Sequence, residues 1–195
     1  MTVMFQTFFD YIETFLPMPE ENRQQCREWF FEAAFPKGTL LQEAGTVPEY
    51  HNFVVSGFMR NYFMNEKGEE VTTDLNDGPR FFTSYQYFLD QTPAPENIVC
   101  ITDCELLRIS HQGVEALMKV GGHVIREFSM MVMQQSWEEE KQRLHDRTTL
   151  SAEQRYLKFV EEHSAILQHV PLQYIASYLG IKPESLSRIR RKLIS

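Results

Sequence analysis

The stretch from Val170 to Leu193 reads VPLQYIASYLGIKPESLSRIRRKL and contains two short amphipathic segments on either side of Gly180. In the first segment apolar side chains recur at helical spacing, and glycine is the residue type that most often ends a helix in the left-handed conformation. Pro183 suits the first position of a second helix, and Glu184 beside it favours the positive end of the helix dipole. The pattern predicts two helices joined by a sharp turn.

The second predicted helix has an apolar face that begins at Leu186 and an opposite face of serine, arginine and lysine. Two helices joined by a glycine-containing turn, the second with basic residues facing outward, are typical of a helix-turn-helix that binds the major groove of DNA. An ordinary surface pair of helices is the alternative. The residues expected to contact DNA are Lys182, Glu184, Ser185, Ser187, Arg188, Arg190, Arg191 and Lys192.

The distribution of charge also separates the C-terminal part from the rest of the chain. The 195 residues carry a net charge of -8, which taken alone disfavours nucleic acid as a partner. Residues 148–195, however, hold seven Lys and Arg against four Asp and Glu, whereas residues 1–147 hold twelve against twenty-three. An acidic body with a basic C-terminal end is expected of a DNA-binding unit attached to a domain with another role.

The acidic body begins with two apolar-periodic segments, residues 5–16 and 22–34, which predict helices. Residues 36–111 then alternate short β-rich runs with turn signals such as Lys67-Gly68. Many short strands at this spacing predict a jelly roll or barrel.

Residues 120–147 predict one long helix in which Val124, Phe128, Met131 and Gln135 follow heptad spacing. The simplest partner for this stripe is its copy in a second subunit, and packing on the chain's own β-domain is the alternative; both can apply. We therefore predict an α+β fold: an N-terminal jelly-roll β-barrel flanked by helices (1–119, the effector domain), a dimerisation helix (120–147) and an all-α helix-turn-helix domain (148–195).

This order of elements resembles the Crp/Fnr family, which includes the cyclic-AMP receptor protein and the fumarate–nitrate regulator. FPKGTLLQEAG (35–45) resembles the opening strands of the family's β-roll, and QYIASYLGIKPESLSRIRRKL (173–193) resembles its Q-x-I-A-x-x-L-G-x-x-x-E-x-x-S-R-x-x-x-x-L motif. IASYLGIKPESLSRIRR (175–191) is similar to the Bacteroidetes branch. The resemblance implies a homodimeric transcription regulator that binds a palindromic operator in double-stranded DNA, with RNA polymerase as a further candidate partner.

The resemblance also locates a cyclic-nucleotide site, in which a Gly-Glu pair holds the ribose and an Arg-Ser or Arg-Thr pair holds the phosphate. The corresponding positions here read Thr83-Ser84 and Ala94-Pro95. The cation is missing and proline removes an amide donor, and a buried phosphate without a countercharge is too costly to hold. The departures predict that cyclic AMP is not the ligand.

The segment around these positions is rich in aromatic residues. Either an apolar effector, whose identity the sequence does not reveal, occupies the former nucleotide pocket, or the rings fill that pocket and no effector binds; the second interpretation is favoured. The residues expected at the pocket are Phe63, Phe81, Phe82, Thr83, Ser84, Tyr85, Ala94 and Pro95.

Enzymatic motifs are absent from the sequence: it has no Gly-rich phosphate loop, nucleophile elbow or H-E-x-x-H. Cys26, Cys100 and Cys104 are expected to pack in the core, and neither a metal nor a cofactor is expected. A jelly-roll small-molecule-binding protein or enzyme with a vestigial helix-turn-helix is the alternative function. No apolar run reaches the roughly 20 residues that span a bilayer, so we expect a cytoplasmic protein with no membrane partner.

Overall fold

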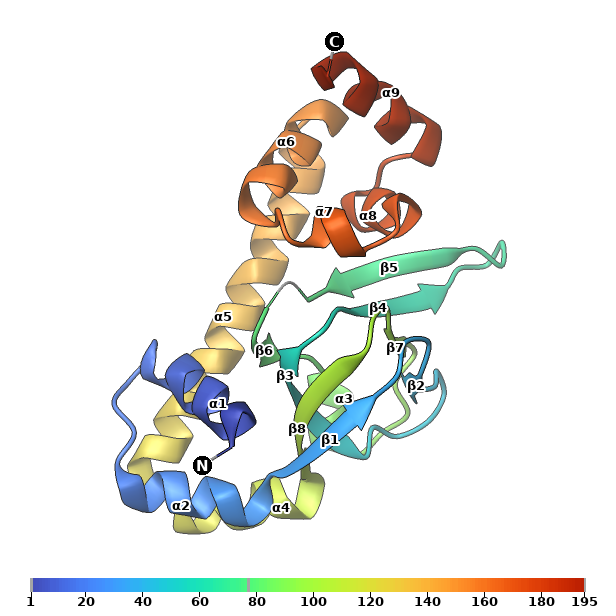
Figure 1. The fold of residues 1–195 in the computed structure, drawn as a ribbon. Coiled ribbons are helices and arrows are strands. Elements are labelled where there is room, and N and C mark those ends of the chain that lie inside the picture. Colours follow the sequence, from blue (N-terminus) through green and yellow to red (C-terminus); the bar gives the residue numbers. More distant parts are fainter. Residues whose placement is uncertain (1, 77, 195) are drawn as a thin grey trace.

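The computed structural model describes residues 2–76 and 78–194. Figure 1 shows a β-roll with helices at one end, a second group of helices beyond the opposite end, and one long helix that runs along the side of the roll and joins them. The two ends of the chain lie far apart, at opposite ends of the molecule.

The β-roll is built from two antiparallel sheets of four strands each within the described residues, with strand orders β1-β8-β3-β6 and β2-β7-β4-β5. The space between the sheets is filled by a buried cluster that includes Val54, Met59 and Leu106. The predicted β-roll is therefore confirmed. In chain order the strands are β1 (Phe31–Phe35), β2 (Leu40–Gln42), β3 (Tyr50–Ser56), β4 (Met59–Met64), β5 (Glu70–Leu75), β6 (Arg80–Phe81), β7 (Asn97–Cys100) and β8 (Cys104–Ser110).

The N-terminal helices are shorter than predicted. Helix α1 spans Val3–Glu13, and α2 spans Glu20–Trp29. The prediction of a helix over residues 22–34 was wrong in its second half, because β1 occupies that part and pairs with β8 from Phe31 to Phe35. This pairing joins segments about seventy residues apart, and it overrides the local helical pattern.

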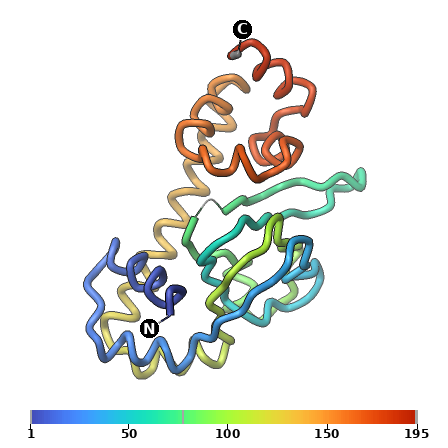
Figure 2. The backbone as a smooth tube through the Cα atoms, in the orientation of Figure 1, coloured from blue at the N-terminus to red at the C-terminus, as the bar shows by residue number. Residues whose placement is uncertain are grey.

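The same end of the roll is closed by α1, α4 (His111–Val120) and the start of α5 (Gly122–Thr149). Figure 2 shows these segments side by side although they are distant in the chain. Their side chains form one buried cluster with β3 and β8, composed of Phe8, Phe9, Ile12, Met18, Cys26, Phe30, Phe53, Leu107, Ile109, Leu117, Ile125 and Phe128. All three cysteines are buried and unpaired by disulfides.

Helix α5 begins two residues later than predicted, because Gly122 adopts a left-handed φ of +62° that separates it from α4. It is 28 residues long. No helix in the described ranges is both long enough and apolar enough to cross a membrane.

The C-terminal group comprises α6 (Ala152–Glu162), α7 (Ile166–His169), α8 (Leu172–Leu179) and α9 (Pro183–Ile194). A capping box between Ser151 and Gln154 starts α6. The buried cluster of this group also contains Leu75 of β5 and Ile101, which follows β7. The β-roll and the C-terminal helices therefore share a hydrophobic core.

Candidate functional sites

The turn between α8 and α9 is held by backbone hydrogen bonds. Gly180 has φ 64° and ψ 37°, the left-handed conformation that the sequence predicted for it. Its N–H donates to the carbonyl of Ser177 at 3.0 Å, and the N–H of Ile181 donates to that of Ala176 at 2.8 Å. Because Ile181 is buried and Leu186 of α9 is only 1% exposed, the two helices are fixed to each other at this turn.

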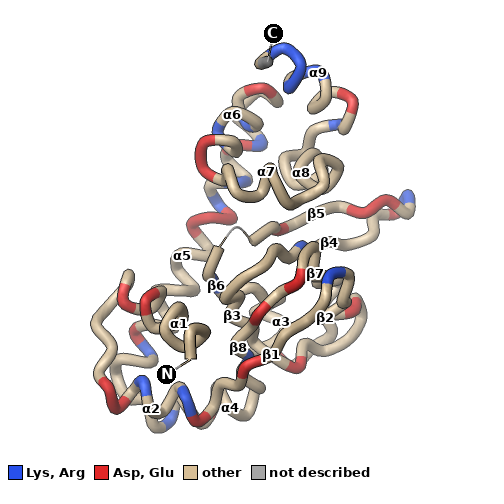
Figure 3. The backbone as a smooth tube through the Cα atoms, in the orientation of Figure 1, with Lys and Arg blue, Asp and Glu red and all other residues tan. Residues whose placement is uncertain are grey.

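The residues predicted to contact DNA lie on α9 and in the turn before it. Glu184 and Arg188 are exposed and four residues apart, so they share one helical face. Figure 3 shows Lys and Arg gathered in the second half of α9. Lys192 is also ion-paired there with Glu153 of α6, at an N–O distance of 3.1 Å. The exposed members of the set are Lys182, Glu184, Ser187, Arg188, Arg191 and Lys192, and the half-buried members are Ser185 and Arg190.

Helix α8 is docked on β5 of the β-roll. The Thr72 N–H of β5 donates to Ser177 Oγ of α8 at 2.9 Å. Beside this bond, the guanidinium of Arg60, a 2% exposed residue of β4, lies 3.8 Å from the centre of the Tyr174 ring and is ion-paired with Glu70. A buried arginine held by an aromatic ring and a carboxylate is costly to separate from either. The contact therefore fixes the C-terminal helices against the roll.

A cavity of about 540 Å³ lies between the β-roll and α5. Of the residues that the sequence placed at an effector pocket, Phe81, Phe82, Thr83, Ser84, Tyr85 and Pro95 line it. Phe63 and Ala94 do not, and Ala94 is fully buried. Phe53 and Phe88 are fully buried as well, so aromatic rings fill part of this region but leave the cavity beside them.

The nucleotide positions are occupied by internal contacts. The Ala94 N–H donates to the carbonyl of Thr46 at 2.9 Å, so this amide is not available to a phosphate. Ser84 precedes helix α3 (Tyr85–Asp90), and its hydroxyl donates a hydrogen bond to Glu96 Oε2 at 3.2 Å. Both positions therefore make their polar contacts within the chain, and the lack of a phosphate anchor stays a prediction.

His51 lies on the cavity wall, with its ring stacked on Phe81 at 4.4 Å between centroids. Its Nδ1 is 3.1 Å from Thr83 Oγ1. The Thr83 hydroxyl oxygen accepts a hydrogen bond from the Asn52 N–H at 2.9 Å, so its own hydrogen is available to donate to Nδ1 of a neutral imidazole. Burial lowers the pKa of His51 from 6.5 to about 3.

We expect this histidine to make the fold less stable in acid. The unfolded chain binds a proton on His51 below about pH 6.5, whereas the folded chain does not until about pH 3, so stability is lost as the pH falls through this window. Between pH 7 and pH 5 the loss from this one residue is about 1–2 kcal/mol, reduced from the full linkage value because the residue keeps some contact with solvent.

The measurement is urea unfolding at both pH values. His51→Gln retains a hydrogen-bond acceptor for Thr83 and should remove this part of the pH dependence. The control is His123→Gln, because the His123 side chain is 83% exposed. Equal pH dependence in wild type and His51→Gln would contradict the assignment.

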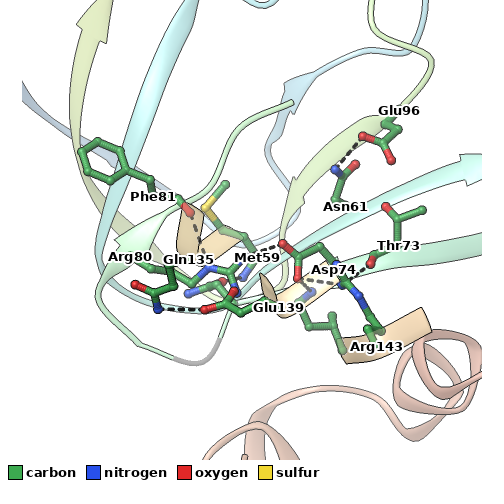
Figure 4. Close-up of polar contacts among 12 residues, drawn as sticks. Met59, Asn61, Thr73, Asp74, Arg80, Phe81, Glu96, Gln135, Glu139 and Arg143 are labelled. Atoms are coloured by element: carbon green, nitrogen blue, oxygen red, sulfur yellow. Dashed lines mark hydrogen bonds and ion pairs between the residues drawn. The ribbon is translucent and has the colours of Figure 1, made fainter. Parts of the chain in front are cut away.

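The charged wall of the cavity was not predicted. Asp74 at the end of β5 is ion-paired with both Arg80 of β6 and Arg143 of α5. Arg143 Nη1 lies 3.3 Å from Asp74 Oδ1, and it also donates a hydrogen bond to the carbonyl of Thr73 at 2.6 Å. Arg80 also faces Glu139 of α5, as Figure 4 shows. These residues carry no shared sequence signal, because three separate elements bring them together.

Of the four residues predicted for a dimer interface, Val124 and Phe128 lie on the inner side of α5. Phe128 is only 6% exposed and packs on Phe15 and Phe81 of its own chain, and Val124 packs on the same cluster. Met131 is half-buried and Gln135 is exposed. Phe128 therefore has little surface left for a partner, and its role in the single chain is to close the β-roll.

A different stripe of α5 is exposed. Met130, Met133, Trp137 and Leu144 are 65%, 47%, 70% and 65% exposed. They follow one another at intervals of three, four and seven residues, which places them on one face at heptad spacing. Exposed Glu140 interrupts this stripe between Trp137 and Leu144, and none of the four apolar residues belongs to the hydrophobic clusters of the described residues.

Comparison with known proteins agrees with this architecture. Residues 32–120 match the family model described as a cyclic nucleotide-binding domain. No curated protein matches the sequence.

Solved structures match over most of the chain. The c-di-GMP responsive global regulator CLP of Xanthomonas campestris has a TM-score of 0.71 at 14% identity, over 90% of this chain and 91% of that one. FixK2 from Bradyrhizobium japonicum has a TM-score of 0.71 at 16% sequence identity, and the match covers 84% of each chain. The Thermus thermophilus catabolite activator protein has a TM-score of 0.58 at 19% identity, and the match covers 92% of this chain and 85% of that one. Residues 32–120 thus match the cyclic nucleotide-binding domain model, and the chain as a whole has the fold of Crp/Fnr-type regulators.

Proposed function

We propose that this chain is a homodimeric, sequence-specific DNA-binding regulator of transcription of the Crp/Fnr type, acting in the cytoplasm. The observation that carries the proposal is the pair of helices α8 and α9 fixed at the Gly180 turn, which we interpret as a helix-turn-helix whose second helix exposes Glu184 and Arg188 on one face. The fold shared with Crp/Fnr-type regulators supports it.

Helix α9 is the proposed recognition helix. From its first half, Glu184 accepts a hydrogen bond from a cytosine amine and Arg188 donates two bonds to a guanine. Ser185 and Ser187 are short donors to bases or phosphates. Lys182, Arg190, Arg191 and Lys192 contact phosphates, which position the helix without reading sequence. Lys192 exchanges its ion pair with Glu153 for this contact.

Dimerisation is proposed through the exposed face of α5 formed by Met130, Met133, Trp137 and Leu144, and not through Phe128. Apolar side chains at heptad spacing on a 28-residue helix suit a parallel two-stranded coiled coil with the same residues from a second copy. Such a dimer presents two α9 helices, which fits a palindromic operator whose half-sites lie about 34 Å apart.

The effector domain is proposed to have lost cyclic-nucleotide binding, because the phosphate anchor is missing and the Ala94 amide is bonded to Thr46. The alternative, a jelly-roll small-molecule-binding protein or enzyme with a vestigial helix-turn-helix, is favoured by the cavity of about 540 Å³. It leaves the exposed basic side of α9 without a role.

Selection of bound sequences from a random double-stranded DNA library tests the proposal. We expect an inverted repeat to be enriched, and the full-length protein to bind it about 10³-fold or more tightly than random DNA at physiological salt. If no sequence is enriched and the binding is uniform and weak, the proposal fails. A co-purifying small molecule together with that result would favour the alternative function.

A further inference from the structure

We infer that the cavity between the β-roll and α5 binds a small organic cation with an ammonium group, and not a phosphate ester. Such a cation would be the effector of the proposed regulator, so its biological role rests on the proposed function. Binding to the cavity is nevertheless a property of the protein that can be measured without DNA.

The first observation is a negative charge without a countercharge. Glu96 Oε2 accepts from Asn61 Nδ2 at 2.8 Å and from Ser84 Oγ at 3.2 Å. Both donors are neutral and more than nine-tenths buried. In the described parts of the chain, no Lys, Arg or His forms an ion pair with Glu96. A carboxylate held in place by neutral donors on a cavity wall favours a cationic ligand.

The second observation is a pair of buried acceptors with no partner. Asn61 Oδ1 and Thr73 Oγ1 are buried, form no hydrogen bond, and belong to residues that line the cavity. The two residues are neighbours across the sheet. Asn61 of β4 pairs with Asp74 of β5, and Tyr62 pairs with Thr72, so Thr73 has no partner in the register and is the extra residue of a β-bulge. Figure 4 shows Asn61 between Glu96 and Thr73. Buried polar atoms are normally bonded; Asn61 Oδ1 can only accept and the Thr73 hydroxyl can also accept, so the two atoms beside a carboxylate indicate a site for N–H donors.

The third observation concerns the positive groups of the cavity. The guanidinium groups of Arg80 and Arg143 both pair with Asp74, and Arg80 also faces Glu139. With Glu96 and Glu140 included, the lining residues carry four acidic side chains and two basic ones. An anionic ligand would have to displace these pairs, whereas a cation meets a wall that is already net negative.

The remaining lining suits an apolar or aromatic group attached to the ammonium. Phe82 and Tyr85 lie on the roll side, and Phe128 and Val132 lie on the α5 side. An ammonium near Glu96, Asn61 and Thr73 therefore places a short hydrocarbon chain or ring among aromatic side chains. We choose 2-phenylethylamine as the probe because it combines both features.

Titration calorimetry with the full chain at pH 7 tests the inference. We expect saturable binding of 2-phenylethylamine, and affinities at least about tenfold weaker for neutral 2-phenylethanol and for anionic phenyl phosphate, because each lacks the charge-assisted hydrogen bond to Glu96. Cyclic AMP should show no saturable binding near micromolar concentration.

Two variants test the location of the site, and a third serves as the control. Glu96→Gln keeps an acceptor for Asn61 and Ser84 but removes the charge, and it should weaken amine binding about tenfold or more. Thr73→Val removes the unpaired hydroxyl with little change in shape and should weaken binding less. The matched control is Glu66→Gln, because Glu66 is exposed between β4 and β5, outside the cavity, and its replacement should leave binding unchanged.

The inference is overturned if the amine does not bind, if the alcohol or the phosphate binds equally well, or if Glu96→Gln binds like the wild type while folded. Circular dichroism establishes folding, and Thr73→Val provides the answer if Glu96→Gln is unfolded. Failure here leaves specific DNA binding untouched, and failure of DNA binding leaves the amine titration valid, so the two outcomes are distinguishable.

Discussion

A chain in which Met133 and Trp137 are both replaced by glutamate is expected to be a monomer at concentrations where the wild type is a dimer. Both side chains lie on the exposed apolar face of α5, and Trp137 is 70% exposed. Burial of an exposed tryptophan covers on the order of 100 Å², which contributes about 2.5 kcal/mol at about 25 cal/mol/Å². A two-fold axis doubles this contribution, because each subunit supplies one such side chain. The glutamates would also place like charges across the axis.

We expect the dissociation constant to rise by about 10³-fold or more, since each factor of ten corresponds to about 1.4 kcal/mol and binding recovers only part of the buried-area energy. Sedimentation velocity over a dilution series measures this. The control is Trp29→Glu, because Trp29 of α2 is 40% exposed and is the only other tryptophan in the chain. An unchanged dimer in the double variant would show that this face is not the interface.

Arg188→Ala is expected to cost about 1–3 kcal/mol in binding to the cognate operator and to relax the preference at one base step, because the variant loses a bidentate contact with guanine. Without DNA, Arg188 is exposed on α9 four residues after Glu184. Its replacement should therefore leave the folded structure intact, and the effect should appear in specific binding only.

The matched variant is Arg191→Ala on the same helix, because Arg191 is also exposed but is proposed to contact phosphate. It should weaken binding to all sequences alike and reduce the slope of log affinity against log salt by about one unit. Fluorescence anisotropy with cognate and random duplexes at several salt concentrations measures both effects. If Arg188→Ala lowered the affinity for both duplexes equally, the assignment of base readout to Arg188 would be wrong.

Features that depend only on neighbouring residues could be predicted from the sequence. The left-handed Gly180, the apolar faces of α8 and α9 and the start of α6 at Ser151 follow from helix capping and helical periodicity, which act within a few residues. The β-roll also followed from local turn signals. The prediction that a phosphate has no anchor is local in the same way, because it depends on residue types at Ala94 and Pro95.

The direction in which each apolar or polar face points depends on the packing of the whole chain. The stripe of Val124 and Phe128 and the stripe of Met133 and Trp137 both have helical spacing, so periodicity does not distinguish them; α1 and the β-roll cover the first and leave the second exposed. Pairing with β8 likewise converted residues 31–35 from predicted helix to strand.

The cavity wall depended on the tertiary structure to the same degree. Asn61, Thr73 and Glu96 come from separate segments, and a β-bulge and the neighbouring strand β7 bring them together. Contacts of this kind join residues that are far apart in the chain, and local sequence patterns contain no information about which distant segments will meet, because the meeting is decided by how the whole core packs.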